Sequence, residues 1–233
     1  MTSTFPGGTA VSRLHVYDWD AADGLCGGSP HVHLACTEAY VVVGGRGELH
    51  TLTAAGPART ELRPGTVVWF GPGTIHRAIN LDGALQVVVV MQNSGLPEAG
   101  DAVLAFPPDI LADPEAYQRA AQVHTEADAH RRRDLAIEGY SALGADLAAG
   151  RTASLEHFYR QAVALRTDRL DRWETVWRSG PLAAAQQTAE QLRTLRAGRT
   201  DHLLQAALRC EQPPEAASRA LGMCGRLDTY KLE

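Results

Sequence analysis

Two short segments of the chain carry side chains that commonly bind metal ions. The first contains His31, His33 and Glu38, and the second contains His76 at the start of an expected strand. In an extended strand, residues i and i+2 point to the same face, so His31 and His33 present two imidazoles side by side. Two histidines and a carboxylate that converge on one point suit a divalent first-row metal ion. These residues therefore indicate a metal site, and His76 supplies a further ligand.

The spacing of these residues resembles the two signature motifs of the cupin superfamily. The first motif reads His-x-His, three or four residues, Glu, six residues, Gly; it fits through Gly45. The second reads Gly, five residues, Pro-x-Gly, two residues, His, three residues, Asn; it fits through Gly65, Gly73, His76 and Asn80. One departure is Pro72, which stands directly before Gly73 and leaves Gly71 at the proline position. The resemblance covers about 11–92.

The resemblance implies a small jelly-roll β-barrel that holds one divalent transition metal ion at its centre. His31, His33, Glu38 and His76 would be the protein ligands. Three histidines and one glutamate fit Fe(II), Mn(II), Ni(II), Co(II) and Zn(II), among which we favour Fe(II). Open coordination positions would make the ion catalytic rather than structural. The catalytic candidates are Glu38 and, because it shares the same strand face, Tyr40, whose phenol could meet a substrate.

Cupin centres of three histidines and one glutamate resemble those of oxygenases that cleave activated carbon–carbon bonds. We therefore expect a metal-dependent dioxygenase that acts on a small molecule and dioxygen. One alternative is a metal-dependent sugar or sugar-phosphate isomerase or epimerase, although the five arginines up to Ile110 form no obvious inward cluster for a phosphate. Another alternative is a non-catalytic cupin that senses a ligand, because a fold does not dictate a function.

The composition and the spacing of apolar residues change near residue 108. This change predicts a barrel over 1–108 and an α-helical extension over 109–233. In the first part, Gly and Pro separate short segments in which apolar and polar residues alternate. This pattern is typical of an antiparallel double-sheet or closed β structure. The expected strands are 11–17, 31–36, 39–43, 47–52, 59–62, 67–70, 75–80 and 85–92, with a linker over 93–108. Expected helices run from Pro114 to about 142, over 152–178, from Pro181 to Gly198, and over 200–208. This extension could pack on the barrel or form a homodimer contact.

Composition narrows the classes of partner and location. The net charge is -5, with 5 basic against 10 acidic residues up to Ile110 and 17 of each sign afterwards. Mild acidity argues against nucleic acid, and no apolar run approaches the roughly 20 residues that span a membrane. The stretch 1–10 has neither the basic start nor the apolar core of a signal peptide, and the four cysteines form no CxxC pair. We expect reduced thiols and a cytoplasmic location.

Several other residues invite a functional interpretation that the pattern does not favour. His50 alternates with apolar neighbours and could face outward or inward. Trp69 and Met91 could line a pocket, but core packing is the better interpretation. Glu126 and His130 lie i, i+4 apart, yet a solvated helix face is expected there instead of a second metal site. The stretch 224–233 could fold over the barrel mouth, although its sequence fixes no position.

Overall fold

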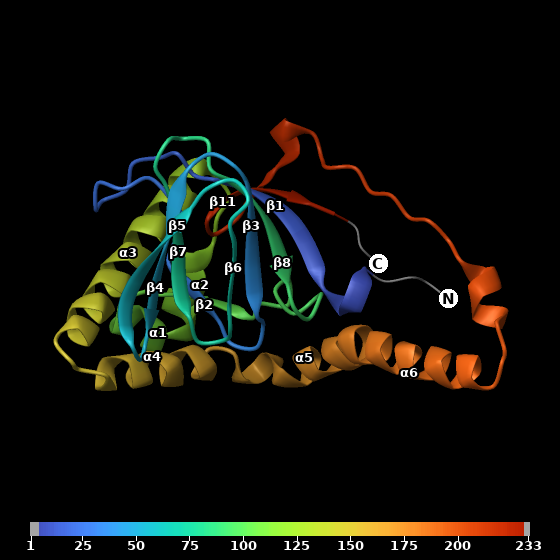
Figure 1. The fold of residues 1–233 in the computed structure, drawn as a ribbon. Coiled ribbons are helices and arrows are strands. Elements are labelled where there is room, and N and C mark those ends of the chain that lie inside the picture. Colours follow the sequence, from blue (N-terminus) through green and yellow to red (C-terminus); the bar gives the residue numbers. More distant parts are fainter. Residues whose placement is uncertain (1–4, 231–233) are drawn as a thin grey trace.

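A computed structural model describes residues 5–230 and shows a β-barrel flanked by helices (Figure 1). Eleven strands form two antiparallel sheets within the described part, a six-stranded sheet in the order β10-β11-β1-β8-β3-β6 and a five-stranded sheet in the order β5-β4-β7-β2-β9. The strands are β1 Ala10–Val16, β2 His31–His33, β3 Glu38–Gly44, β4 Gly47–Thr53, β5 Gly56–Leu62, β6 Val67–Phe70, β7 Ile75–Asn80, β8 Gln86–Met91, β9 Ala102–Leu104, β10 Ala220–Leu221 and β11 Gly225–Thr229. The expected double-sheet jelly-roll fold followed by helices is confirmed.

Strand alternation builds the inside of the barrel. In β3, Tyr40 and Val42 are buried, whereas the exposed fraction of Val43 is 45%. β8 repeats the pattern with Val87, Val89 and Met91. Because successive side chains point to opposite faces, one face of each strand fills the space between the sheets. This interior core also takes in Trp173 and Cys224, which lie far along the chain.

A second core joins the five-stranded sheet to the helices. It combines strand residues such as Val32 and Ile75 with helix residues such as Ala136 and Phe158. The helical elements are η1 Pro6–Gly8, α1 Pro108–Ala112, α2 Pro114–Ala121, α3 Glu126–Ala148, α4 Ala153–Ala164, η2 Thr167–Arg169, α5 Leu170–Trp177, the π-helix η3 Arg178–Leu182, α6 Ala183–Arg196, η4 Asp201–Gln205 and η5 Ala216–Ser218. In Figure 1, α4, α5 and α6 follow one another beneath the barrel, and α6 extends beyond it.

Most helices are shorter than the sequence predicts, but the break expected at Pro181 is absent, because the π-helix η3 joins α5 to α6. The first expected helix is broken after Ala121, because Thr125 and Asp128 form a capping box that starts α3 anew. The second is interrupted by η2 between α4 and α5. The expected helix over 200–208 is a single 3-10 segment, η4.

The expected all-helical extension over 109–233 needs correction near its end. β11 pairs with β1 along Ser12↔Thr229 to Val16↔Gly225, so the chain returns to the six-stranded sheet (Figure 1). The expected linker also contains β9, which pairs with β2. Residues 1–4 and 231–233, the ends of the stretches 1–10 and 224–233 discussed above, lie outside the described residues.

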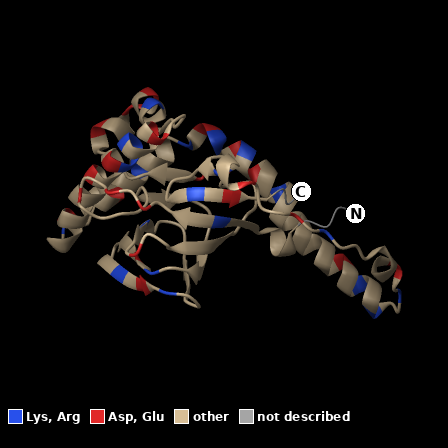
Figure 2. Ribbon diagram, turned by 90° about the horizontal axis from the view of Figure 1, so that it is seen from above, with Lys and Arg blue, Asp and Glu red and all other residues tan. Residues whose placement is uncertain are grey.

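Figure 2 shows basic and acidic residues mixed along the helices and not gathered on one face. Within 5–230, no helix is both long and apolar enough to cross a membrane.

Candidate metal centre

The four predicted ligands come from three strands and meet between the two sheets. His31 and His33 lie on β2 and His76 lies opposite His31 on β7, all in the five-stranded sheet, whereas Glu38 begins β3 in the other sheet. One ligand atom from each residue lies within 4.8 Å of all the others. All four are buried, with exposed fractions between 0% for His76 and 7% for His33. The prediction that these residues converge is therefore confirmed.

The motif glycines shape the turns beside these strands. Gly45 has φ of 68°, and a Cβ there would lie 2.2 Å from the backbone carbon of Ala84. Gly73 has φ of 86° in the turn before β7. Because L side chains rarely adopt positive φ, both positions favour glycine. Pro72 sits in that second turn without disturbing His76.

Hydrogen bonds orient each imidazole toward the centre. Nδ1 of His31 contacts the carbonyl of Ser29 at 2.9 Å, and Nδ1 of His76 contacts the carbonyl of Thr74 at 3.1 Å. Because a carbonyl oxygen only accepts, Nδ1 must carry the proton in both rings. In a neutral imidazole this leaves the Nε2 lone pair free for a metal ion.

His33 has a different partner. Its Nδ1 lies 3.1 Å from Oδ2 of Asp101, a fully buried carboxylate. Sequence reasoning missed Asp101, which it placed in the linker. The only signal was an acidic residue before a short apolar run, and that pattern is common in loops.

Two buried acceptors face each other at the centre. Oε2 of Glu38 lies 3.0 Å from Nε2 of His76 and 3.3 Å from Nε2 of His33. Neither Glu38 Oε2 nor His76 Nε2 makes a hydrogen bond. Buried polar atoms without partners are rare and costly, and a cation between them would satisfy both. The donor set thus fits a divalent metal ion.

The charge states fit the same conclusion. Burial holds the pKa of His31 well below its usual range, so this ring is neutral and could serve as a ligand. Burial opposes the charge on Glu38, yet the His76 and His33 imidazoles hold its pKa well below its usual range. Burial also disfavours charge on His33, but Asp101 and Glu38 outweigh it and raise the pKa to about 9. A metal ion must displace that proton, so its affinity rises with pH.

Tyr40 and Cys224 lie beside the ligands. Tyr40 is 1% exposed, and its ring centroid lies 6.4 Å from that of His76. Burial, the Glu38 carboxylate and the Cys224 thiol raise the pKa of Tyr40 well above its usual range. The Cys224 thiol lies 4.0 Å from Nδ1 of His31, behind the ring. Tyr40 therefore remains a protonated phenol near the centre.

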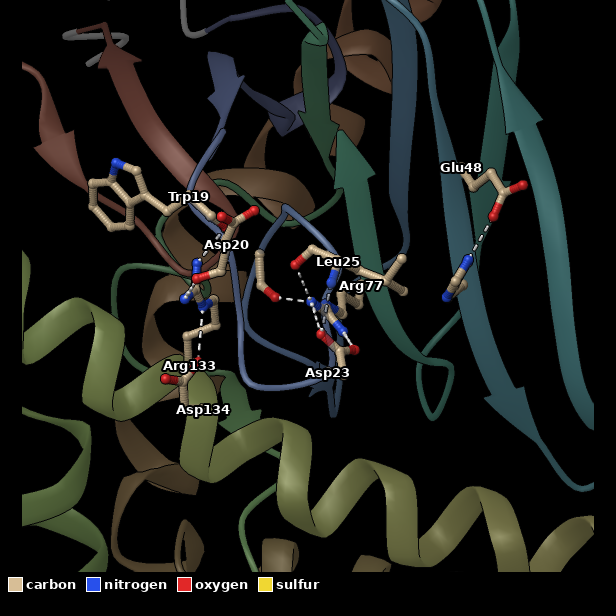
Figure 3. A network of polar contacts seen from close by, with 10 residues as sticks. Trp19, Asp20, Asp23, Leu25, Glu48, Arg77, Arg133 and Asp134 are labelled. Carbon is tan, nitrogen blue, oxygen red and sulfur yellow. Dashed lines mark hydrogen bonds and ion pairs between the residues drawn. The ribbon is translucent and has the colours of Figure 1, made fainter. Parts of the chain in front are cut away.

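Other residues singled out in the sequence lie away from it. Nε2 of His50 contacts Glu48 at 2.7 Å, and Arg77 turns toward Asp23 and Leu25 (Figure 3). Trp69 is 72% exposed on the edge strand β6, so the expectation that it packs in the core is wrong, whereas Met91 is a core residue. His130 stacks on Trp19 instead of binding a metal, and in the described chain no second group of three potential ligands exists.

The site does not open into the larger hollow of the structure. A hollow of about 750 Å³ lies between α2 and η2, where Tyr117, Gln118, Arg166 and Asp168 line it. None of the four candidate ligands contributes to its wall. The geometry of the four donors, and not this hollow, therefore marks the candidate centre.

Comparison with known proteins supports the fold. The family model described as cupin matches residues 17–124, which include all four ligands. No curated protein sequence matches significantly.

Three of the solved structures that match part of the chain are of low identity. A conserved protein with a double-stranded β-helix domain from Klebsiella pneumoniae is 22% identical, with coverage of 37% of this chain and 67% of that chain and a TM-score of 0.29. The TDP-fucose-3,4-ketoisomerase WlaRA from Campylobacter jejuni is 12% identical, with coverage of 39% of this chain and 64% of that chain and a TM-score of 0.32. A crystal structure from work on the DMSP lyases RdDddP and RnDddQII is 22% identical, with coverage of 41% of this chain and 43% of that chain and a TM-score of 0.30.

The chain thus spans about two thirds or less of these structures, and similarity at this level does not bear on its reaction. The two motifs, the double-sheet barrel and the family match agree with one another, and they identify residues 17–124 as a cupin domain.

Proposed function

We propose that this protein is a metal-dependent enzyme that acts on a small molecule through one divalent transition metal ion. The observation that carries the proposal is the pair of buried acceptors, Glu38 Oε2 and His76 Nε2, that make no hydrogen bond and lie beside two further imidazoles. His31, His33, Glu38 and His76 would hold the ion. Fe(II) is favoured, and Mn(II), Ni(II), Co(II) and Zn(II) also suit such ligands. A bound ion would act as a Lewis acid and, if iron, would bring dioxygen next to the substrate.

The residues around the ligands suggest a weakly charged substrate. Phe70 lies 4.4 Å from His76, ring centroid to centroid, and Tyr40 packs edge-on against Phe70. Arg77 is the one arginine of the described barrel that is buried, and Asp23 and the Gly28 carbonyl hold it away from the ligands. A phosphate group would need a cation that this wall does not offer.

These features favour a dioxygenase over a sugar-phosphate isomerase. Glu38 would serve as the anionic ligand, and its ionised state also suits it to accept a substrate proton. Tyr40 would donate a hydrogen bond to a substrate oxygen, because its phenol stays protonated. The isomerase and the ligand-sensing cupin stay as alternatives that the experiment below separates.

Metal content is the first test. Purified protein should carry close to one equivalent of a divalent transition metal, and His76→Ala should lose most of it. His50→Ala is the matched control, because this buried histidine is bonded to Glu48 and not to the centre. Equal metal content in His76→Ala and the wild type would refute the metal centre.

Oxygen uptake is the second test. Metal-free protein is reconstituted anaerobically with Fe(II), Mn(II), Ni(II) or Zn(II) and then given diols, enols and catechols with oxygen. Uptake that depends on His76 and on substrate supports the dioxygenase. Isomerised products without uptake favour the isomerase, and binding without turnover favours the sensor.

The homodimer and the cytoplasmic location remain predictions. Apolar side chains exposed on α6 and after it, Leu192, Leu195, Leu203, Leu204 and Leu208, support a contact between copies of the chain. Sedimentation equilibrium of the wild type would test this, and a monomer at all concentrations would contradict it.

A further inference from the structure

The three histidines of the centre are oriented in two different ways. His31 and His76 each bond the backbone carbonyl two residues earlier, so their own strands fix them. His33 instead depends on Asp101, 68 residues further along the chain. Its orientation is therefore a tertiary property that another part of the molecule must maintain.

The two carboxylate oxygens of Asp101 do different things. Oδ1 accepts from the backbone amides of Leu34 at 3.0 Å and Ala35 at 2.7 Å, which fixes the turn after β2. Oδ2 lies 3.1 Å from Nδ1 of His33. A carboxylate accepts and does not donate, so it selects the ring tautomer whose Nε2 is free for metal. The first contact is structural, and the second acts on a ligand.

Side chains of the helical half hold the segment that carries Asp101. Nη2 of Arg166 donates to the Ala102 carbonyl at 2.9 Å and to the Tyr117 hydroxyl at 3.2 Å. That hydroxyl accepts from the Leu104 amide at 3.0 Å. Because β9 is the edge of the five-stranded sheet, these contacts satisfy backbone groups that have no neighbouring strand.

A second set of hydrogen bonds holds the backbone just before Asp101. Nε1 of Trp173 donates to the Ala99 carbonyl at 3.1 Å, and Nη1 of Arg169 donates to the same oxygen at 3.4 Å. Residues from α2, the α4–η2 connection and α5 thus hold the backbone on both sides of Asp101. β9 in turn pairs with β2 through His33↔Ala102 and His31↔Leu104.

We infer that Asp101 is a positioning residue for the metal ligand His33, and that Arg166 of the helical half keeps Asp101 in place through β9. The inference rests on the metal site proposed above. It gives the helices that pack on the barrel a role in metal affinity, in addition to their role in stability.

The test compares metal affinity and stability in three variants. Asp101→Asn keeps Oδ1 for the Leu34 and Ala35 amides but places an NH2 donor against His33. Arg166→Gln removes the guanidinium that bonds Ala102. Arg178→Gln is the matched control, because this exposed arginine contacts Glu174 and the ring of Trp177 and not the segment around Asp101. The Zn(II) dissociation constant is measured by competition with a chromophoric chelator, and Tm is measured with and without Zn(II).

Asp101→Asn should weaken Zn(II) binding by about 10- to 100-fold and shrink the rise in Tm that Zn(II) causes. Arg166→Gln should weaken binding by about two- to tenfold. Arg178→Gln should bind as the wild type does. If Asp101→Asn lowers the metal-free Tm but binds Zn(II) like the wild type, Asp101 is only structural and the inference is overturned. If only Arg166→Gln behaves in that way, the role of the helical half is overturned.

Two further results separate this inference from the proposed function. A wild type that binds no Zn(II), Co(II) or Fe(II) would refute the metal centre itself. If Asp101→Asn does not fold, ¹⁵N NMR of the Zn(II)-loaded wild type decides. The His33 ring should then coordinate through Nε2 with a proton on Nδ1. Coordination through Nδ1 would overturn the role of Asp101.

Discussion

α3 and α6 are both helices of the second half of the chain, but they relate to the barrel in opposite ways. α3 buries eight residues, including Ala136 and Ile137, whereas α6 buries none. Leu192 and Leu195 of α6 stay 49% and 46% exposed. Apolar residues at helical spacing therefore predict a stripe that needs a partner, but they do not say whether the chain itself supplies it.

The largest expected effect lies where helices meet the barrel. Phe158 of α4 is 2% exposed within the core shared with the five-stranded sheet. Phe158→Ala should lower the free energy of unfolding by about 3–5 kcal/mol, since it removes a large buried ring and leaves a cavity. Urea denaturation followed by circular dichroism measures the loss. A loss below about 1 kcal/mol would mean that α4 is no more anchored than α6.

Two glycines of α3 give a sharper contrast. A Cβ on Gly139 would lie 2.3 Å from the Ala105 carbonyl oxygen, whereas one on Gly144 would meet only the Leu52 side chain, at 3.7 Å. Gly139→Ala should cost about 1–3 kcal/mol through the clash. Gly144→Ala should instead stabilise by roughly 0.5–1 kcal/mol, because alanine is the better helix former. Effects of equal sign in both variants would contradict the close approach of α3 to the barrel.

A third region is the strand β11, which returns to the barrel. The stability that its residue Asp228 contributes should depend on pH. Burial raises the pKa of Asp228, but contacts with His15 and Arg219 outweigh it and hold the pKa below its usual range. A depressed folded-state pKa gives stability that is present above the unfolded-state pKa and lost as the pH falls through the folded-state pKa.

Asp228→Asn should therefore cost about 1–3 kcal/mol at pH 7, and the difference from the wild type should shrink below about pH 4. Urea denaturation at pH 7, 5 and 3.5 measures it. A difference that does not change with pH would show that the carboxylate charge is not what anchors β11.

The smallest effect is expected in α6. Leu195→Ser should change the free energy of unfolding of the isolated chain by no more than about 0.5 kcal/mol, because the side chain is already largely solvated. Hydrogen exchange should be faster for the amides of α6 than for those of α3. Strong protection of α6 at low protein concentration would mean that another surface covers it.

The positions of the four candidate ligands were predictable because their spacing is local and resembles the two cupin motifs. His31 and His33 share a face through strand alternation, and a turn with Gly73 leads into His76. The break before α3 was also visible in principle, since Thr125 and Asp128 are three residues apart, as a capping box requires. Trp69 was misjudged because it lies on the outward face of the edge strand β6, where Val67 is exposed as well, whereas Phe70 on the other face packs on the core.

Contacts between distant residues were not predictable. Asp101 and Cys224 meet the histidines of β2 only after β9 and β11 have taken their places in the sheets. The two-residue β10 and the five-residue β11, Gly225–Thr229, carry too few apolar positions for the alternation of a strand to stand out.

The sequence by itself determined the donor types, their spacing and the charge balance, because these depend on residue identity and on the local periodicity of strands and helices. Only the tertiary structure decided that four donors from two sheets converge, that Asp101 stands behind His33, and which helices find a surface to cover. Such contacts depend on how whole elements pack, and packing is a property of surfaces that the chain brings together only when it folds.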